Sequence, residues 1–128
     1  MQRKEWLISS VYWIHLPFIL IWIGLFFVPS SIWSHKVTFH FWYVISLTAI
    51  QFLWSLCIFH YTKQIGIICP LTGLMQYLRG YPFSSPKNYL HTYISEVSNK
   101  LKIKINDKAV NILSLVTLGI ITLQYFFQ

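Results

Sequence analysis

Most side chains of this sequence that could do chemistry are histidines and cysteines within or beside apolar segments. His15, His40 and His60 lie inside or at the ends of such segments, where an ionisable side chain usually faces the interior of a helical bundle. Facing imidazoles can hold haem in a membrane protein. On one helix, however, His40 and His60 would be about 30 Å apart, and His15 would lie about 13 Å inside another helix. This spacing disfavours two-histidine ligation within one chain, so haem b is an alternative and no cofactor is predicted.

A metal site has equally little support. Cys57 and His60 are three residues apart, which places both on one face of a helix. Cys69 and His15 are the only further candidate ligands, and neither Cys-x-x-Cys nor His-Glu-x-x-His is present. The chain has three acidic residues and no glycine-rich phosphate loop or nucleophile elbow. The sequence therefore predicts no metal site and no catalytic residue.

One predicted helix carries a row of polar side chains in an otherwise apolar segment. His40, Thr48, Gln51 and Ser55 recur on one helical face. Such residues usually form hydrogen bonds between neighbouring helices in a membrane. The alternative is a lined path for a proton or a small polar solute, although no carboxylate lies inside a predicted span to relay protons.

The composition shows which solvent these residues meet. The 128-residue chain is 55% hydrophobic and 10% charged, whereas soluble domains average about 25% charged residues. Its net charge of +7 comes from residues between apolar segments, as in proteins oriented by anionic lipid. The sequence therefore predicts a membrane protein whose surroundings are the lipid bilayer and other membrane-protein subunits, and it does not indicate nucleic-acid binding.

Three uncharged segments are long enough to span a membrane at 1.5 Å per residue: about 6–29, 39–61 and 109–127. The first is too long for a signal-peptide core and lacks a small-residue cleavage site, so we expect it to remain as a helix. Pro17 is expected to kink it. The fold class is therefore all-α, a single membrane domain in which three transmembrane helices form a bundle.

Residues 62–108 form a basic segment at the cytoplasmic side or membrane interface. The apolar stretch Ile65 to Leu78 is too short to span and predicts a re-entrant or interfacial helix. Ser85 and Pro86 mark the start of a further helix. Its apolar residues recur at helical spacing, which predicts an amphipathic surface helix. These apolar residues are Tyr89, Leu90, Tyr93, Ile94, Val97 and Leu101. Asn106 and Asp107 are expected to cap the last span.

The positive charges predict an orientation. Arg3 and Lys4 precede the first span, the first loop has only Lys36, and residues 62–108 hold seven lysines and arginines. The positive-inside rule then places the N-terminus and the long basic segment on the cytoplasmic or matrix side, with the C-terminus opposite. The expected location is a bacterial inner membrane or an organelle inner membrane.

The segment from Cys69 to Arg79 (CPLTGLMQYLR) resembles the signature of a family of small bacterial membrane proteins of unknown function. In that family Cys-Pro-Leu-Thr follows the second hydrophobic segment and leads to a short helix. A glutamate is common there where Met75 stands here, so this chain lacks that carboxylate. The family has no established activity, and the resemblance implies architecture only. The motif residues are Cys69, Pro70, Leu71, Thr72 and Arg79, and looser matches are His15, His40, Tyr89, Tyr93 and Ile94.

The motif has a simple physical interpretation. Pro70 biases Cys69 toward an extended backbone, and Thr72 is expected to cap a helix from Gly73 to Arg79. This arrangement would place the Cys69 thiol at the mouth of the bundle. Either an inert packing thiol or a reactive or metal-binding cysteine would fit that position.

These observations favour a non-enzymatic membrane protein, an accessory or anchor subunit that packs against partner membrane proteins. Two alternatives stay open. One is a redox protein that holds haem or quinone through His15, His40 or His60. The other is a component of a transporter for a small solute or ion, with Gln51 and His15 on its polar path.

Overall fold

The computed structural model describes residues 2–89 and 93–128, and every regular element in this part of the chain is helical. This confirms the predicted all-α class. In chain order the elements are α1 (Gln2–Gly24), α2 (Lys36–Cys57), α3 (Phe59–Thr62), α4 (Pro70–Leu78), the 3-10 helix η1 (Pro86–Tyr89), α5 (Tyr93–Lys100) and α6 (Asp107–Phe126).

Three of these helices, α1, α2 and α6, are long and apolar enough to cross a membrane. They are the three expected spans with shifted ends. α1 continues through Pro17 but ends at Gly24, five residues before Pro29. α2 ends at Cys57, and a separate short helix, α3, follows it after Ile58. α6 begins where Asn106 accepts a hydrogen bond from the amide of Ala109 at 2.7 Å, as expected for its cap.

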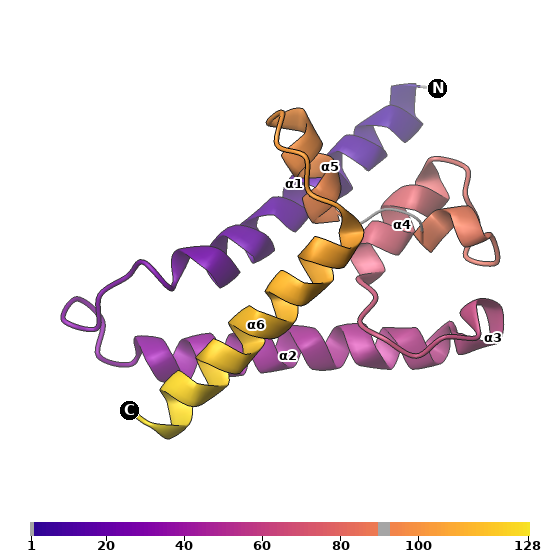
Figure 1. Cartoon of the computed structure of the whole chain (residues 1–128). Coiled ribbons are helices and arrows are strands. Elements are labelled where there is room, and N and C mark those ends of the chain that lie inside the picture. Colours follow the sequence, from indigo (N-terminus) through magenta and orange to yellow (C-terminus); the bar gives the residue numbers. More distant parts are fainter. Residues whose placement is uncertain (1, 90–92) are drawn as a thin grey trace.

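The spans form an open arrangement (Figure 1). α1 and α2 diverge from the loop that joins them, and α4 packs on α1 between their far ends. α6 runs across α2, with its start beside α5 and its end beside the first turns of α2. The chain therefore has a wide end, which carries α4 and α5, and a narrow end at the loop.

The apolar core lies toward the narrow end. Phe41 and Val44 of α2 and Ile121 of α6 are buried together there. The ring of Phe41 stacks on that of Tyr125 with centroids 4.0 Å apart, and Trp22 ties α1 to α6 by donating to Thr117 Oγ1 at 3.1 Å. Because this core holds the three spans at one end, the wide end is left to be filled by the basic segment.

α4 begins earlier than the sequence indicated. Its N-cap is Cys69, in an extended conformation, and Pro70 occupies the first helical turn. The expectation that Thr72 caps a helix starting at Gly73 is therefore wrong. The reason is that proline needs no hydrogen-bond partner at a helix start and its fixed φ suits that position. Only Pro70–Leu78 of the predicted stretch Ile65 to Leu78 is helical.

The segment after α4 forms two short helices. Ser85 Oγ accepts a hydrogen bond from the amide of Lys87 at 3.3 Å, which caps η1 as the sequence indicated. The predicted amphipathic helix includes residues 90–92, which lie outside the described residues, and α5 follows them. α5 buries Tyr93, Ser95 and Ser98. Leu101, which was expected on the apolar face of this helix, lies just beyond its end at Lys100 and is exposed.

Candidate functional site

The wide end of the molecule brings together the two residues that the sequence offered as chemical candidates. His15 projects from the middle of α1, and Cys69 stands at the N-cap of α4. The two side chains lie within hydrogen-bond distance, with Cys69 Sγ 3.4 Å from His15 Nε2. His15 is 6% exposed, whereas Cys69 is partly exposed. The packing of α4 on α1 thus creates a thiol–imidazole pair from residues 54 positions apart.

An aromatic side chain from a third helix holds the imidazole. Tyr93 of α5 stacks on His15 with ring centroids 3.9 Å apart and planes 18° from parallel. Its hydroxyl donates a hydrogen bond to the backbone carbonyl of Tyr12 at 2.9 Å, and the Tyr12 and Tyr93 rings are 5.0 Å apart. The pKa of Tyr93 is raised to about 12, chiefly because burial disfavours the phenolate and further because Tyr12 and Glu96 lie near. Tyr93 is therefore a neutral, fixed wall of the site.

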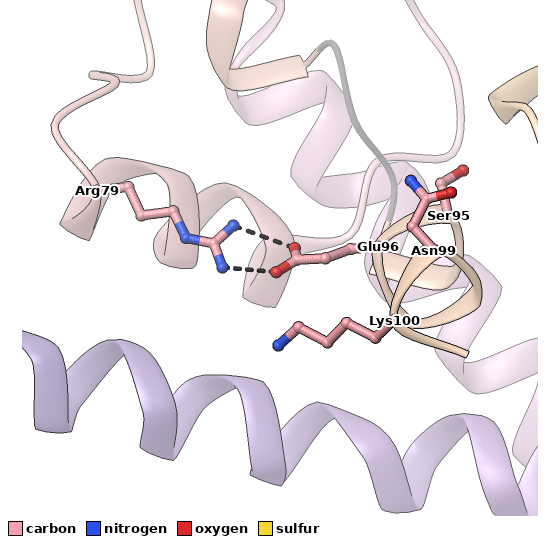
Figure 2. A pocket seen from close by; sticks show the side chains of 5 residues that line it. All are labelled: Arg79, Ser95, Glu96, Asn99 and Lys100. Carbon is pink, nitrogen blue, oxygen red and sulfur yellow. Dashed lines mark hydrogen bonds and ion pairs between the residues drawn. The ribbon is translucent and has the colours of Figure 1, made fainter. Parts of the chain in front are cut away.

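A second group of side chains joins α4 to α5. Arg79, at the C-cap of α4, forms a two-pronged ion pair with Glu96, at N···O distances of 2.7 and 3.1 Å (Figure 2). The hydrogen bond and charge of Glu96 raise the pKa of Arg79 further above its ordinary value. Lys100 lies beside this pair, with its Nζ 4.0 Å from the ring centroid of Tyr12.

These residues line two open clefts at the Arg79 end of α4. One cleft, of about 380 Å³, lies between α4 and α5 and is lined by Arg79, Ser95, Glu96, Asn99 and Lys100. Another, of about 280 Å³, shares Arg79 and Lys100 and runs along the first half of α1, where Glu5, Ile8, Ser9, Tyr12 and Trp13 line it. His15 and Cys69 line neither cleft; Tyr12, which lines the second one, contacts Tyr93, and Tyr93 stacks on His15.

Asn88 fixes the position of α4. It is 1% exposed, and its Nδ2 donates to the carbonyls of Gly73 at 3.2 Å and Tyr81 at 2.7 Å. Gly73 also allows the Phe83 ring to come close, since a Cβ there would lie 3.3 Å from Phe83 Cε1. These contacts fasten the loop after α4 to the helix that carries Cys69 at one end and Arg79 at the other.

The other predicted site residues lie elsewhere. His40 is buried near the narrow end, and its Nε2 is 2.8 Å from the Trp22 carbonyl. Gln51 is partly exposed on α2, and His60 is exposed on α3, beyond the break at Ile58 that separates it from Cys57. Pro70 shapes the start of α4, while Leu71 and Thr72 are partly buried in its first turn. The structure thus joins His15 with Cys69 and leaves His40, Gln51 and His60 apart from them.

The sequence did not identify Tyr12, Tyr93, Glu96 or Lys100 as site residues. Tyr93 appeared there as one apolar position of an amphipathic helix, and no local pattern connects it to His15, which is 78 residues away. The net positive charge of residues 62–108 was the only signal for the basic clefts, and it could not say which cations would face α1.

The chemistry open to this region is that of a thiol beside a base. An imidazole within hydrogen-bond distance can accept the thiol proton, and the resulting thiolate is a nucleophile. Nδ1 of His15 is buried and has no hydrogen-bond partner among the residues described. Within the same part of the chain, no group of three His, Cys, Asp or Glu side chains is placed to bind a metal ion.

No protein-family model, curated protein or solved structure matches this chain. The resemblance of residues 69–79 to the Cys-Pro-Leu-Thr membrane family therefore stays a prediction made from the motif.

Proposed function

We propose that this chain is a small, non-enzymatic subunit of a membrane-protein assembly, whose three spans pack against partner membrane proteins. The observation that carries the proposal is how little of the spans the chain itself covers. Of the apolar 18-residue stretch in each helix, only 6% is buried inside the structure in α1, 17% in α2 and 11% in α6. A helical bundle that works alone covers more of its helices, because side chains between them must pack and exclude lipid.

The outward faces of the spans also suit contact with other helices. Ser46 and Ala49 are exposed near the middle of α2, and Gly119 is exposed in α6 with nothing within 4 Å of its Cβ position. In a membrane, small and weakly polar residues bring helices together, since apolar side chains gain nothing by leaving lipid for protein. These three positions are therefore the expected contact points with a partner.

The two alternative functions have weaker support from the geometry. His15 is within hydrogen-bond distance of Cys69, and His40 is hydrogen-bonded to the Trp22 carbonyl. Because Trp22 lies seven residues beyond His15, the two histidines are about 10 Å apart along α1. Two axial ligands of one haem must lie at the same depth in the membrane, which this offset does not favour. On the polar face of α2, Ser55 accepts a hydrogen bond from the Gly66 amide at 2.9 Å. Ser55 and His40 therefore serve packing, which does not favour a polar path for solutes.

Purification of the tagged chain in mild detergent tests the proposal. We expect a membrane protein to co-purify in fixed stoichiometry, as measured by light scattering and mass spectrometry. Gly119→Leu should release it because the substitution fills the small contact point, whereas Leu115→Phe, a matched change at an exposed apolar position of α6, should not. A monomer that carries no stoichiometric protein would refute the proposal. The absorbance spectrum of the same sample tests the haem alternative, since bound haem gives a Soret band.

A further inference from the structure

We propose that Cys69 is a site of S-acylation, at which its thiol accepts a long-chain acyl group from a coenzyme A thioester with His15 as the base. The inference concerns the chain itself and does not depend on the subunit role proposed above. It rests on the juxtaposition of the thiol–imidazole pair, an exposed apolar segment and a basic cleft.

The pair provides the nucleophile. His15 Nε2 lies 3.4 Å from Cys69 Sγ, and stacking on Tyr93 fixes the plane of the imidazole. The thiol is also at the start of α4, where the backbone amides of Leu71 and Thr72 have no partner inside the helix and Pro70 has no N–H. Those amides favour negative charge near Sγ and on the oxygen of an attacked carbonyl.

The reaction exchanges one thioester for another. His15 Nε2 accepts the proton of Cys69 Sγ, and the sulfur forms a bond to the carbonyl carbon of the acyl thioester. The bond from that carbon to the sulfur of coenzyme A then breaks, and the departing thiolate takes the proton from His15. The step needs no oxidant, reductant or energy source, because a thioester is consumed and a thioester is formed.

The surroundings of Cys69 suit a long acyl chain. The segment leading to it is apolar and faces outward, with Ile65 60% and Ile67 51% exposed. His15 is nine residues past Trp6, which corresponds to about 13 Å along α1 from that exposed aromatic residue. The thiol is thus below the headgroup level, where an acyl chain can enter from the bilayer. Cysteines beside membrane spans are the usual sites of such acylation.

The basic cleft suits the other end of the donor. Coenzyme A carries several phosphate charges, and Lys100 lines both clefts together with Arg79, which is paired with Glu96. Arg79 is at the opposite end of α4 from Cys69, about 15 Å along the helix, so the phosphates would lie at a distance from the thiol. The surrounding segment, residues 62–108, contains seven lysines and arginines against two acidic residues. Positive charge thus lies on the water side of the thiol and apolar surface on the lipid side. An acyl-coenzyme A at a membrane surface has the matching arrangement, with its phosphates toward water and its acyl chain toward lipid.

Cys57 offers a matched control within the same chain. It is more exposed than Cys69 and lies at the end of α2. If exposure alone governed acylation, Cys57 would be modified first. The proposal requires the opposite order.

The test uses the full chain in lipid nanodiscs with alkynyl palmitoyl-coenzyme A, followed by a fluorescent tag and by hydroxylamine, which cleaves thioesters. We expect Cys57→Ser to retain the label and Cys69→Ser to lose it. His15→Gln in the Cys57→Ser background should slow labelling at least about tenfold, since a general base contributes about 10²–10⁴-fold in enzymes. Equal labelling of both cysteines, or an unchanged rate in His15→Gln, would overturn the proposal. Thermal unfolding followed by tryptophan fluorescence shows whether the variants are folded, and Cys69 labelling by a small maleimide shows whether the thiol is still accessible in His15→Gln.

A second arm tests the donor. Lys100→Gln should raise severalfold the concentration of palmitoyl-coenzyme A that gives half the maximal rate. It should leave unchanged the reaction with the palmitoyl thioester of N-acetylcysteamine, which has no phosphates. No effect on the coenzyme A donor, or an equal effect on both donors, would refute the assignment of the cleft to the phosphates.

Discussion

Replacing Asn88 should loosen α4 and thereby separate Cys69 from His15. Asn88 donates two hydrogen bonds to backbone carbonyls, at 2.7 and 3.2 Å, from a position that is 1% exposed. Each net hydrogen bond contributes about 1 kcal/mol, and an acceptor left buried without a donor costs about 1–3 kcal/mol more. The hydrogen bond to the Tyr81 carbonyl is only partly buried, whereas the one to the Gly73 carbonyl is buried, so water can replace the donor at Tyr81.

We therefore expect Asn88→Ala to lower the free energy of unfolding by about 2–4 kcal/mol, from the lost bond to the Gly73 carbonyl and the burial of that carbonyl without its donor. Asn88→Asp should lower it further, because a carboxylate would place oxygen atoms against both carbonyls without any proton to donate. Unfolding by sodium dodecyl sulfate in mixed micelles, followed by tryptophan fluorescence and extrapolated to zero denaturant, measures the difference.

Asn99→Ala is the matched control, since Asn99 is exposed on α5 and should change stability by no more than about 0.5 kcal/mol. If Asn88→Ala changed stability as little as this control, the hydrogen bonds of Asn88 would not hold α4 in place. If Asn88→Asp were more stable than Asn88→Ala, the orientation of the amide, with Nδ2 toward both carbonyls, would be wrong.

Three further outcomes follow from the basic end of the molecule. Gly80 has φ of +101° at the end of α4, so Gly80→Ala should cost about 1 kcal/mol in the same unfolding assay, whereas Gly119→Ala should cost nothing; equal effects would contradict the backbone strain. A double-mutant cycle on Arg79 and Glu96, whose side chains are 30% and 22% exposed, should give a coupling of up to about 1 kcal/mol that falls with added salt; a salt-independent coupling would argue against charge pairing. Tyr93 should titrate near pH 12 in ultraviolet absorbance, because its pKa in the folded chain is raised from 10.0. Its contribution to the free energy of unfolding is therefore present in full below pH 10 and is lost as the pH rises through 12. Tyr93→Phe should remove this part of the loss of stability at high pH.

The spans were predictable because hydropathy is a local property. A run of about twenty apolar residues requires an internally hydrogen-bonded helix in lipid, whatever the rest of the chain does. The helix ends were less predictable, since they depend on turns such as the break at Ile58, and the start of α4 at Pro70 was misplaced because Thr72 looked like a better cap. The use of Asn106 as the cap of α6 was predictable, because its hydrogen bond reaches only three residues along the chain.

The candidate site depends on longer distances. The sequence identified Cys69 and His15 separately, from an unusual motif and from an ionisable group inside a span. It did not predict their contact, and it also offered His40 and His60 as candidates, which lie elsewhere. Nor did it indicate that Tyr93 would stack on His15, or that Glu96 would join Arg79 from α5.

The sequence by itself thus determined that the chain is all-helical with three helices long and apolar enough to cross a membrane, because transfer of apolar side chains into lipid is governed by the composition of each segment. Only the tertiary structure decided which polar residues meet. α4 packs on α1, and this brings the Cys69 thiol within 3.4 Å of the imidazole of His15, 54 residues away in the sequence. Such a contact arises from the closing of a long loop by many weak packing interactions, and no short pattern in the sequence encodes it.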